Sequence, residues 1–75
     1  MTNLNKSDIE SLGFKKSNLN NFDCYIKNDV VIVYHKNNKY SISDTKNNYS
    51  QLFLGTISNK LELIKLLKQT GTYEN

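Results

Sequence analysis

The sequence predicts a small α+β protein: a four-stranded antiparallel β-meander with a short N-terminal helix and a longer C-terminal helix packed on one face. Three observations predict this class. Apolar and polar residues alternate through the middle of the chain, Asn pairs separate the alternating segments, and leucines near the C-terminus recur at helical spacing. Because 75 residues can bury only one small core, a single domain over residues 1–75 is expected.

The first predicted element is a short helix that begins with a capping box. Ser7 is expected to cap the amide three residues on, while the Glu10 side chain reaches back to the amide of Ser7. Ile9 and Leu12 then share one side of the helix, and Gly13 can adopt the left-handed conformation that ends it. A helix this short is unstable alone in water, so these apolar residues must pack against something larger.

After a polar connection over residues 15–20, four strands are predicted between residues 21 and 57. Asn tolerates positive φ, so the Asn-containing pairs are expected to form two-residue turns. Those turns pair Lys27 with Val30, Lys36 with Lys39 and Lys46 with Tyr49. The resulting register places Phe22, Cys24, Ile26, Val31, Val33, His35, Tyr40, Ile42 and Phe53 on one face. It places Asp23, Tyr25, Ile32, Tyr34, Ser41, Ser43, Leu52 and Leu54 on the other.

The C-terminal helix is predicted from a second capping signature, Asn59 followed by Glu62, and it is expected to end at Gly71. Its apolar side chains are predicted to share one broad side: Leu61, Leu63, Ile64, Leu66 and Leu67. We expect this side to cover the first face of the sheet as core, since the run is too short for a coiled coil.

The second sheet face is then left largely uncovered, because the N-terminal helix offers too few apolar residues to shield it. Its tyrosines and aliphatic residues, rimmed by lysines, have the composition of a protein interface. We therefore expect this face to form a homodimer or to dock on a partner protein or ribonucleoprotein. The residues expected to contact the partner are Tyr25, Lys27, Tyr34, Lys36 and Lys39.

The sequence offers little for catalysis, and the protein is expected not to be an enzyme and to hold no cofactor or metal. His35 and Cys24, the single His and the single Cys, would lie near one another on adjacent strands, which raises a Cys-His pair. Both are predicted to point toward the helix-covered face, so a packed core cysteine is preferred. A structural zinc needs four N or S ligands, and no phosphate-binding glycine loop is present.

The alternative function is a single-stranded nucleic-acid-binding domain that uses Lys and Tyr on the sheet. The chain has ten lysines, no arginine and a formal net charge of +3. Lysines near the turns could contact phosphates and tyrosines could stack on bases: Lys15, Lys16, Lys27, Lys36, Lys39 and Lys46, with Tyr25, Tyr34, Tyr40, Tyr49 and Tyr73. Without arginine there is no bidentate reader of guanine, which favours the protein partner.

The expected location is cytoplasmic. No apolar run approaches the roughly 20 residues that cross a bilayer, and the first residues lack the apolar stretch of a secretory signal. The lone Cys24 cannot form an internal disulfide, so a chain this small must be held together by its core or by a partner.

Short motifs at the two ends of the chain resemble small uncharacterised phage and mobile-element proteins of Bacteroidota-type bacteria. These motifs are Leu12-Gly13-Phe14, Leu54-Gly55-Thr56-Ile57, Asn59-Lys60-Leu61-Glu62-Leu63 and Leu66-Leu67-Lys68-Gln69-Thr70-Gly71. The resemblance implies a phage origin and a non-catalytic protein that acts by occluding a host protein. It transfers no functional residue. The predicted function is a protein-binding module, an inhibitor of a host nucleoprotein such as a CRISPR effector.

Overall fold

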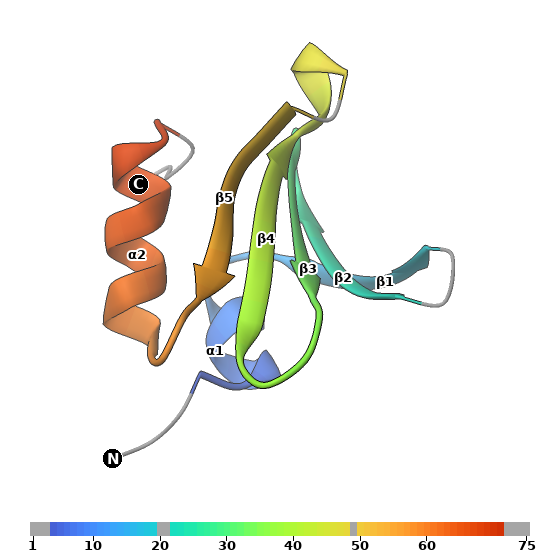
Figure 1. Cartoon of the computed structure of the whole chain (residues 1–75). Helices are drawn as coiled ribbons and strands as arrows, with labels where there is room; N and C mark the ends of the chain where they lie inside the picture. The colour runs from blue at the N-terminus through green and yellow to red at the C-terminus, as the bar shows by residue number, and fades with distance from the viewer. Residues whose placement is uncertain (1–3, 20–21, 49, 72–75) are drawn as a thin grey trace.

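The computed structural model describes residues 4–19, 22–48 and 50–71. An antiparallel sheet with strand order β1-β2-β3-β4-β5 is accompanied by two α-helices (Figure 1), which confirms the α+β class, and the helix layout is similar to the predicted one. The elements are α1 (Lys6–Ser11), β1 (Lys15–Leu19), β2 (Phe22–Lys27), β3 (Val30–Tyr34), β4 (Lys39–Asp44), the 3-10 helix η1 (Thr45–Asn47), β5 (Ser50–Thr56) and α2 (Lys60–Gln69).

The sheet has five strands where four were predicted, because β1 forms in the segment expected to be a polar connection. Lys15 pairs with Ile26, and Ser17 pairs with Cys24. The segment lacks the apolar alternation that marks a strand in a sequence. It lies at an edge of the sheet, where backbone pairing with one neighbour is enough to define a strand and lysines are common.

The N-terminal helix starts two residues earlier than predicted. Asn5 is the N-cap, its side chain accepts from the Asp8 amide at 2.9 Å, and the Asp8 carboxylate accepts from the Asn5 amide at 3.3 Å. This capping box replaces the predicted pair Ser7 and Glu10. Gly13 follows the helix with a φ of +97°, in the left-handed region that was expected there.

The β2–β3 turn follows the prediction, whereas the β3–β4 turn shifts the register by one residue. Lys27 pairs with Val30 as expected. Asn37 and Asn38 both have positive φ, and the Lys39 amide donates to Lys36 O at 2.9 Å, so the predicted two-residue turn is present. The His35 amide also donates to Lys39 O, at 2.8 Å. Two residues therefore face Lys39, and this bulge was not predicted.

The β4–β5 connection is longer than the predicted two-residue turn. It contains η1, with the Asp44 side chain accepting from the Lys46 amide at 2.9 Å, and Asn48 follows in the left-handed conformation. Ile42 pairs with Phe53 as predicted, and a further register shift follows that pair. Tyr49, which was predicted to pair with Lys46, lies outside the described residues.

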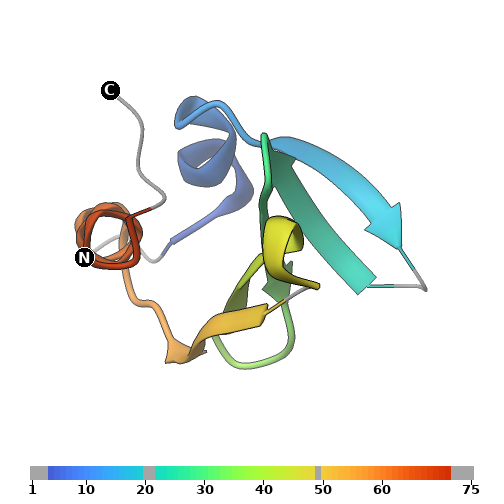
Figure 2. The same cartoon turned by 90° about the horizontal axis from the view of Figure 1, so that it is seen from above.

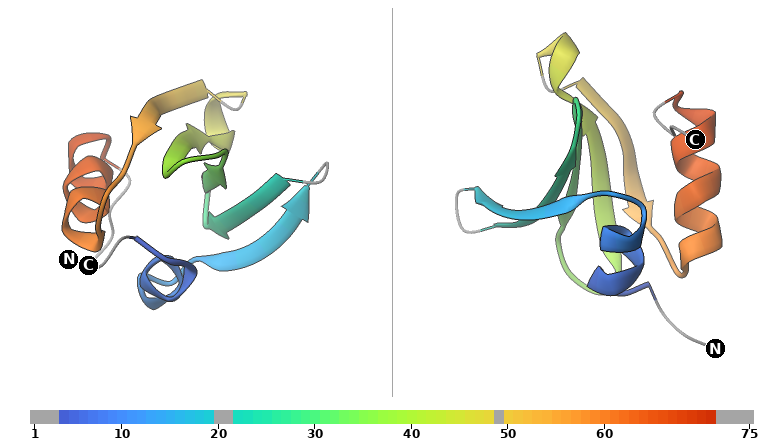
Figure 3. Two further views of the ribbon diagram at one scale, coloured as in Figure 1. Left: turned by 60° about the horizontal axis from the view of Figure 1, so that its bottom comes forward. Right: turned by 180° about the vertical axis from the view of Figure 1, so that it is seen from behind.

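Both helices lie on the same side of the sheet, which bends around them (Figures 2 and 3). One core cluster joins Ile9 of α1, Leu63 and Leu67 of α2, and the sheet residues Ile32 and Ile42, all at most 1% exposed. Asn59 caps α2 as predicted, by accepting from the Glu62 amide at 3.0 Å. Leu61, which was predicted to lie on the buried side of this helix, is 72% exposed.

The predicted division of the sheet into two faces is wrong on its β2–β3 half. The bulge at His35 pairs Ile32, not Val33, with Ile42. Because neighbouring residues on a strand point to opposite faces, this shift exchanges the two lists on one side of the bulge. The helix-covered face therefore carries Tyr25, Ile32, Tyr34, Tyr40, Ile42 and Phe53. The side chain of Phe22 lies outside the described part of the structure.

Candidate functional site

The face of the sheet turned away from both helices, which we call the open face, is organised in three rows that run across the strands. The first row is Lys15, Ile26, Val31, Ser43 and Gln51; the second is Ser17, Cys24, Val33, Ser41 and Leu54; the third is His35, Lys39 and Thr56. These residues share a face because directly paired residues in antiparallel strands project to the same side.

The apolar side chains of the open face are most exposed on β5. Cys24, Val31 and Ser41 are buried, and Ile26 and Val33 are partly buried. Leu54 is 50% exposed on the edge strand, and nearby Leu52 is 36% exposed. The side of the open face along β5 therefore presents apolar surface that no element of the described chain covers.

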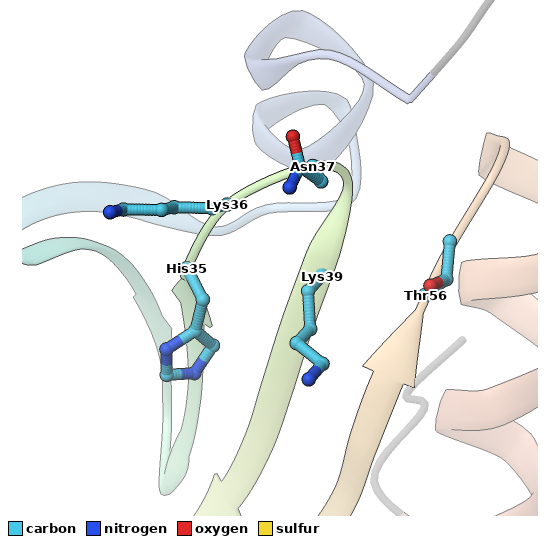
Figure 4. A pocket seen from close by; sticks show the side chains of 5 residues that line it. All are labelled: His35, Lys36, Asn37, Lys39 and Thr56. Carbon is cyan, nitrogen blue, oxygen red and sulfur yellow. The ribbon is translucent and has the colours of Figure 1, made fainter.

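An open hollow of about 480 Å³ lies at the β3–β4 end of this face (Figure 4). His35, Lys36, Asn37, Lys39 and Thr56 line it. The exposed lysines come from either side of the turn that Asn37 helps to form. His35 Nε2 lies 3.1 Å from Ser41 Oγ, which fixes the imidazole over the open face. The hollow therefore gathers cationic groups next to the apolar surface of β5.

The acidic side chains of the strands lie on one face of the sheet only. The three rows of the open face contain Lys15 and Lys39 and include no Asp or Glu. The strand acids lie on the other face, where Asp23 pairs with Tyr34 and Asp44 pairs with Val30. Since no carboxylate of these rows neutralises the lysines, the open face attracts anionic groups.

Two of the residues predicted to contact a partner belong to the covered face. Tyr25 is 6% exposed, and its burial, together with the carboxylates of Asp23 and Glu10, raises its pKa above the ordinary 10.0. Tyr34 packs against the core, with its ring centroid 5.1 Å from that of Tyr40. Tyr40 is itself buried, and its pKa is raised chiefly by that burial. The predicted exposure of Tyr25 is therefore wrong.

The three lysines that were expected to contact the partner lie in two different places. Lys27 Nζ donates to Leu12 O at 2.8 Å and lies 5.9 Å from the centre of the Phe14 ring, so it fastens the α1–β1 connection to β2. Lys36 and Lys39 are exposed and line the hollow, as the prediction requires. The hollow's third basic side chain, His35, was predicted to be covered. Its position depends on the bulge, for which the sequence has no clear signal.

Cys24 and His35 both lie on the open face, but each forms its contact with a different residue of the fold. Cys24 is 1% exposed, and its Sγ donates to Ser17 O at 3.0 Å, which ties β2 to β1. His35 instead contacts Ser41. Within the described residues, no three His, Cys, Asp or Glu side chains come close enough to hold a metal ion. These contacts give the thiol a packing role.

No family model, curated protein or solved structure matches the chain. Among the described helices, none is long and apolar enough to cross a membrane. The phage-protein resemblance consequently stays a prediction.

Proposed function

We propose that this protein is a non-catalytic binding module whose open face docks on a protein partner with an acidic contact surface. The observation that carries the proposal is the open face itself, where half-exposed Leu54 lies in the row next to that of Lys39 and His35, with no carboxylate in the three rows. Interfaces commonly combine an apolar centre with a polar rim, and opposite charge on the partner speeds encounter and fixes register.

A protein partner is favoured over a bare nucleic-acid strand by the positions of the aromatic rings. Tyr25, Tyr34 and Tyr40 lie on the helix-covered face, so they offer no stacking platform on the open face. Tyr49 and Tyr73, the other tyrosines of the alternative hypothesis, lie outside the described residues. A second copy is disfavoured because face-to-face contact would oppose the lysines of both copies.

The inhibitor role expected from the sequence is compatible with this surface. In a nucleoprotein partner, acidic side chains or phosphates could meet Lys36 and Lys39 while an apolar patch covers Leu54. Occlusion of such a host protein, for example a CRISPR effector, requires binding only and uses no catalytic group of this chain.

The proposal is tested by capture from a nuclease-treated lysate of the source cells on the immobilised chain, with bound proteins quantified by mass spectrometry. We expect Leu54→Asp to reduce capture of the specific partner at least about tenfold, as expected for a contact at the centre of an interface. Lys39→Glu should reduce capture mainly at low salt, because a rim charge acts through association rate and is screened.

The matched controls are on the N-terminal turn of α2. Leu61→Asp changes an equally large leucine that is 72% exposed, and Lys60→Glu reverses a charge away from the open face. Both controls should capture as much as the parent chain, because acidic residues suit a helix N-terminus and should not disturb the fold. Equal capture by Leu54→Asp and Leu61→Asp, or loss of all capture on nuclease treatment, would contradict the proposal.

A further inference from the structure

We infer that the free edge of β5 is a strand-addition site for an extended peptide segment with apolar side chains at alternate positions. This site goes beyond the open-face interaction proposed above, because it uses the backbone of β5 and the groove beside α2. It depends on three features of the edge: outward-pointing backbone groups, a strand without charge, and a groove with an apolar floor.

The ladder fixes which backbone groups of β5 point outward. The Ile57 amide donates to Asn38 O at 3.0 Å, on the β4 side. Because hydrogen bonding alternates along an antiparallel strand, the amides of Gly55 and Phe53 also point toward β4. The N–H and C=O groups of Leu54 and Thr56 therefore point away from β4, and no described segment pairs with that side of the sheet.

The two edges of the sheet differ in their protection against a further strand. The β1 edge has five residues and carries exposed Lys15 and Lys16. The β5 edge has seven residues, Ser50–Thr56, and none of them is charged or proline. Lysines on an edge oppose pairing with another chain, and an uncharged edge with exposed leucines favours it.

A groove beside the β5 edge can receive side chains of the added strand. In Figures 1 and 3, α2 runs beside β5. A hollow of about 260 Å³ lies between them, lined by Phe53, Thr56, Glu62, Lys65, Leu66 and Gln69. Phe53 and Leu66 are partly buried against the core and give it an apolar floor. Alternate side chains of an added strand point to the same side, so every second residue of the peptide should be apolar.

An extended segment fits this edge better than a second copy of the chain. Adjacent strands lie about 4.8 Å apart, whereas packed helix axes need about 8–10 Å. In a two-fold antiparallel pairing of β5 with β5, both α2 helices would lie on the same face, beside the junction. They would crowd each other, while a peptide without a helix leaves the groove open.

The test is selection of a random twelve-residue phage-displayed peptide library on the immobilised full chain. We expect enriched peptides with apolar residues at alternate positions, and binding at least tenfold weaker to Thr56→Pro. Proline at this position removes an outward N–H and leaves the β4 ladder intact. Thr56→Lys, which copies the charge of the β1 edge without altering the backbone, should weaken binding as well. Leu61→Asp is the matched control and should bind like the parent chain.

Amide hydrogen exchange of the parent chain with an enriched peptide gives a second readout. Exchange at Leu54 and Thr56 should slow at least tenfold on binding, while Phe53 and Gly55 change little. The inference is overturned by an absence of enriched peptides, by folded Thr56→Pro and Thr56→Lys that bind the peptides as tightly as the parent chain does, or by a dimer of the free chain that Thr56→Pro abolishes. Lys39→Glu separates the two proposals, because it should weaken the open-face partner and spare these peptides.

Discussion

The covered and open faces of the five-stranded sheet are built from the same strands but differ in how deeply their side chains are buried. On the covered face, Ile32 and Ile42 join both helices in the core and are fully buried. On the open face, the exposed fraction of the side chains rises from β4 to β5, where Leu54 is half exposed. The rows that contain lysines on this face contain no carboxylate. Apolar character alone therefore does not identify the core of a small sheet. The side from which the helices approach identifies it.

The comparison is tested most strongly by truncating one side chain on each face. Ile42→Ala should lower the free energy of unfolding by about 2–5 kcal/mol, because it leaves a cavity under both helices. Leu54→Ala, on the strand next to it, should cost less than about 1 kcal/mol because half of this side chain is already in water. Urea unfolding measures both values. Equal losses would mean that the open face is also a core.

The lysines provide a second comparison. Lys27→Met should lower stability by about 1 kcal/mol, because it removes the hydrogen bond to Leu12 O and the contact with the Phe14 ring. Lys39→Met on the open face should stay within about 0.5 kcal/mol of the parent chain. Thermal melts of the two variants give the difference. A larger loss for Lys39→Met would show that the open-face lysine is structural.

Tyrosine ionisation tests the burial of the covered face without truncating an aliphatic core side chain. The pKa values of Tyr25 and Tyr40 are raised above 10.0 mainly by burial. The folded protein therefore holds these protons more tightly than the unfolded chain. Their contribution to stability is complete below about pH 10 and is lost as the pH rises through the folded pKa values. In an ultraviolet titration, Tyr25→Phe and Tyr40→Phe should each remove one late-ionising group. Early ionisation of either tyrosine would place it in solvent.

The smallest effect is expected at Cys24, which is buried although it lies on the open face. Cys24→Ser should leave partner capture unchanged and cost about 1 kcal/mol or less, since a hydroxyl can also donate to Ser17 O. A thiol reagent should react with the parent chain slowly until it unfolds. Loss of capture with an intact melt would instead give the thiol a functional role.

Several features of the fold could be predicted because they depend on neighbours in the sequence. Asn28 adopts the positive φ that its short amide side chain tolerates, Gly13 adopts it because it has no Cβ, and Asn59 caps α2. The start of α1 was misplaced because Asn5-Asp8 and Ser7-Glu10 are overlapping capping patterns, and only the packing of Ile9 and Leu4 selects between them. The strand β1 was missed because an edge strand needs no apolar alternation.

The candidate site could be predicted only in part. Lys36 and Lys39 are exposed, as residues expected to contact a partner must be, but the hollow that they line was not predicted. Leu54 is exposed, as its predicted uncovered face requires. Tyr25 and Tyr34 were predicted on the uncovered face because a two-residue turn without a bulge was expected between β3 and β4. The bulge at His35 places both tyrosines on the covered face instead. Backbone hydrogen bonds create this bulge, and the side-chain pattern does not specify them.

The class of fold, the cap of α2 and the turns at Asn28 and at Asn37 and Asn38 followed from the sequence alone, because they depend on local backbone preference and hydrogen bonding. The tertiary structure decided which face of the sheet is buried and which edge is left uncharged and accessible. Side chains on a strand repeat every two residues, so a single bulge between β3 and β4 exchanges inside for outside. Only the packing of both helices against one face establishes which of the two surfaces remains available for a partner.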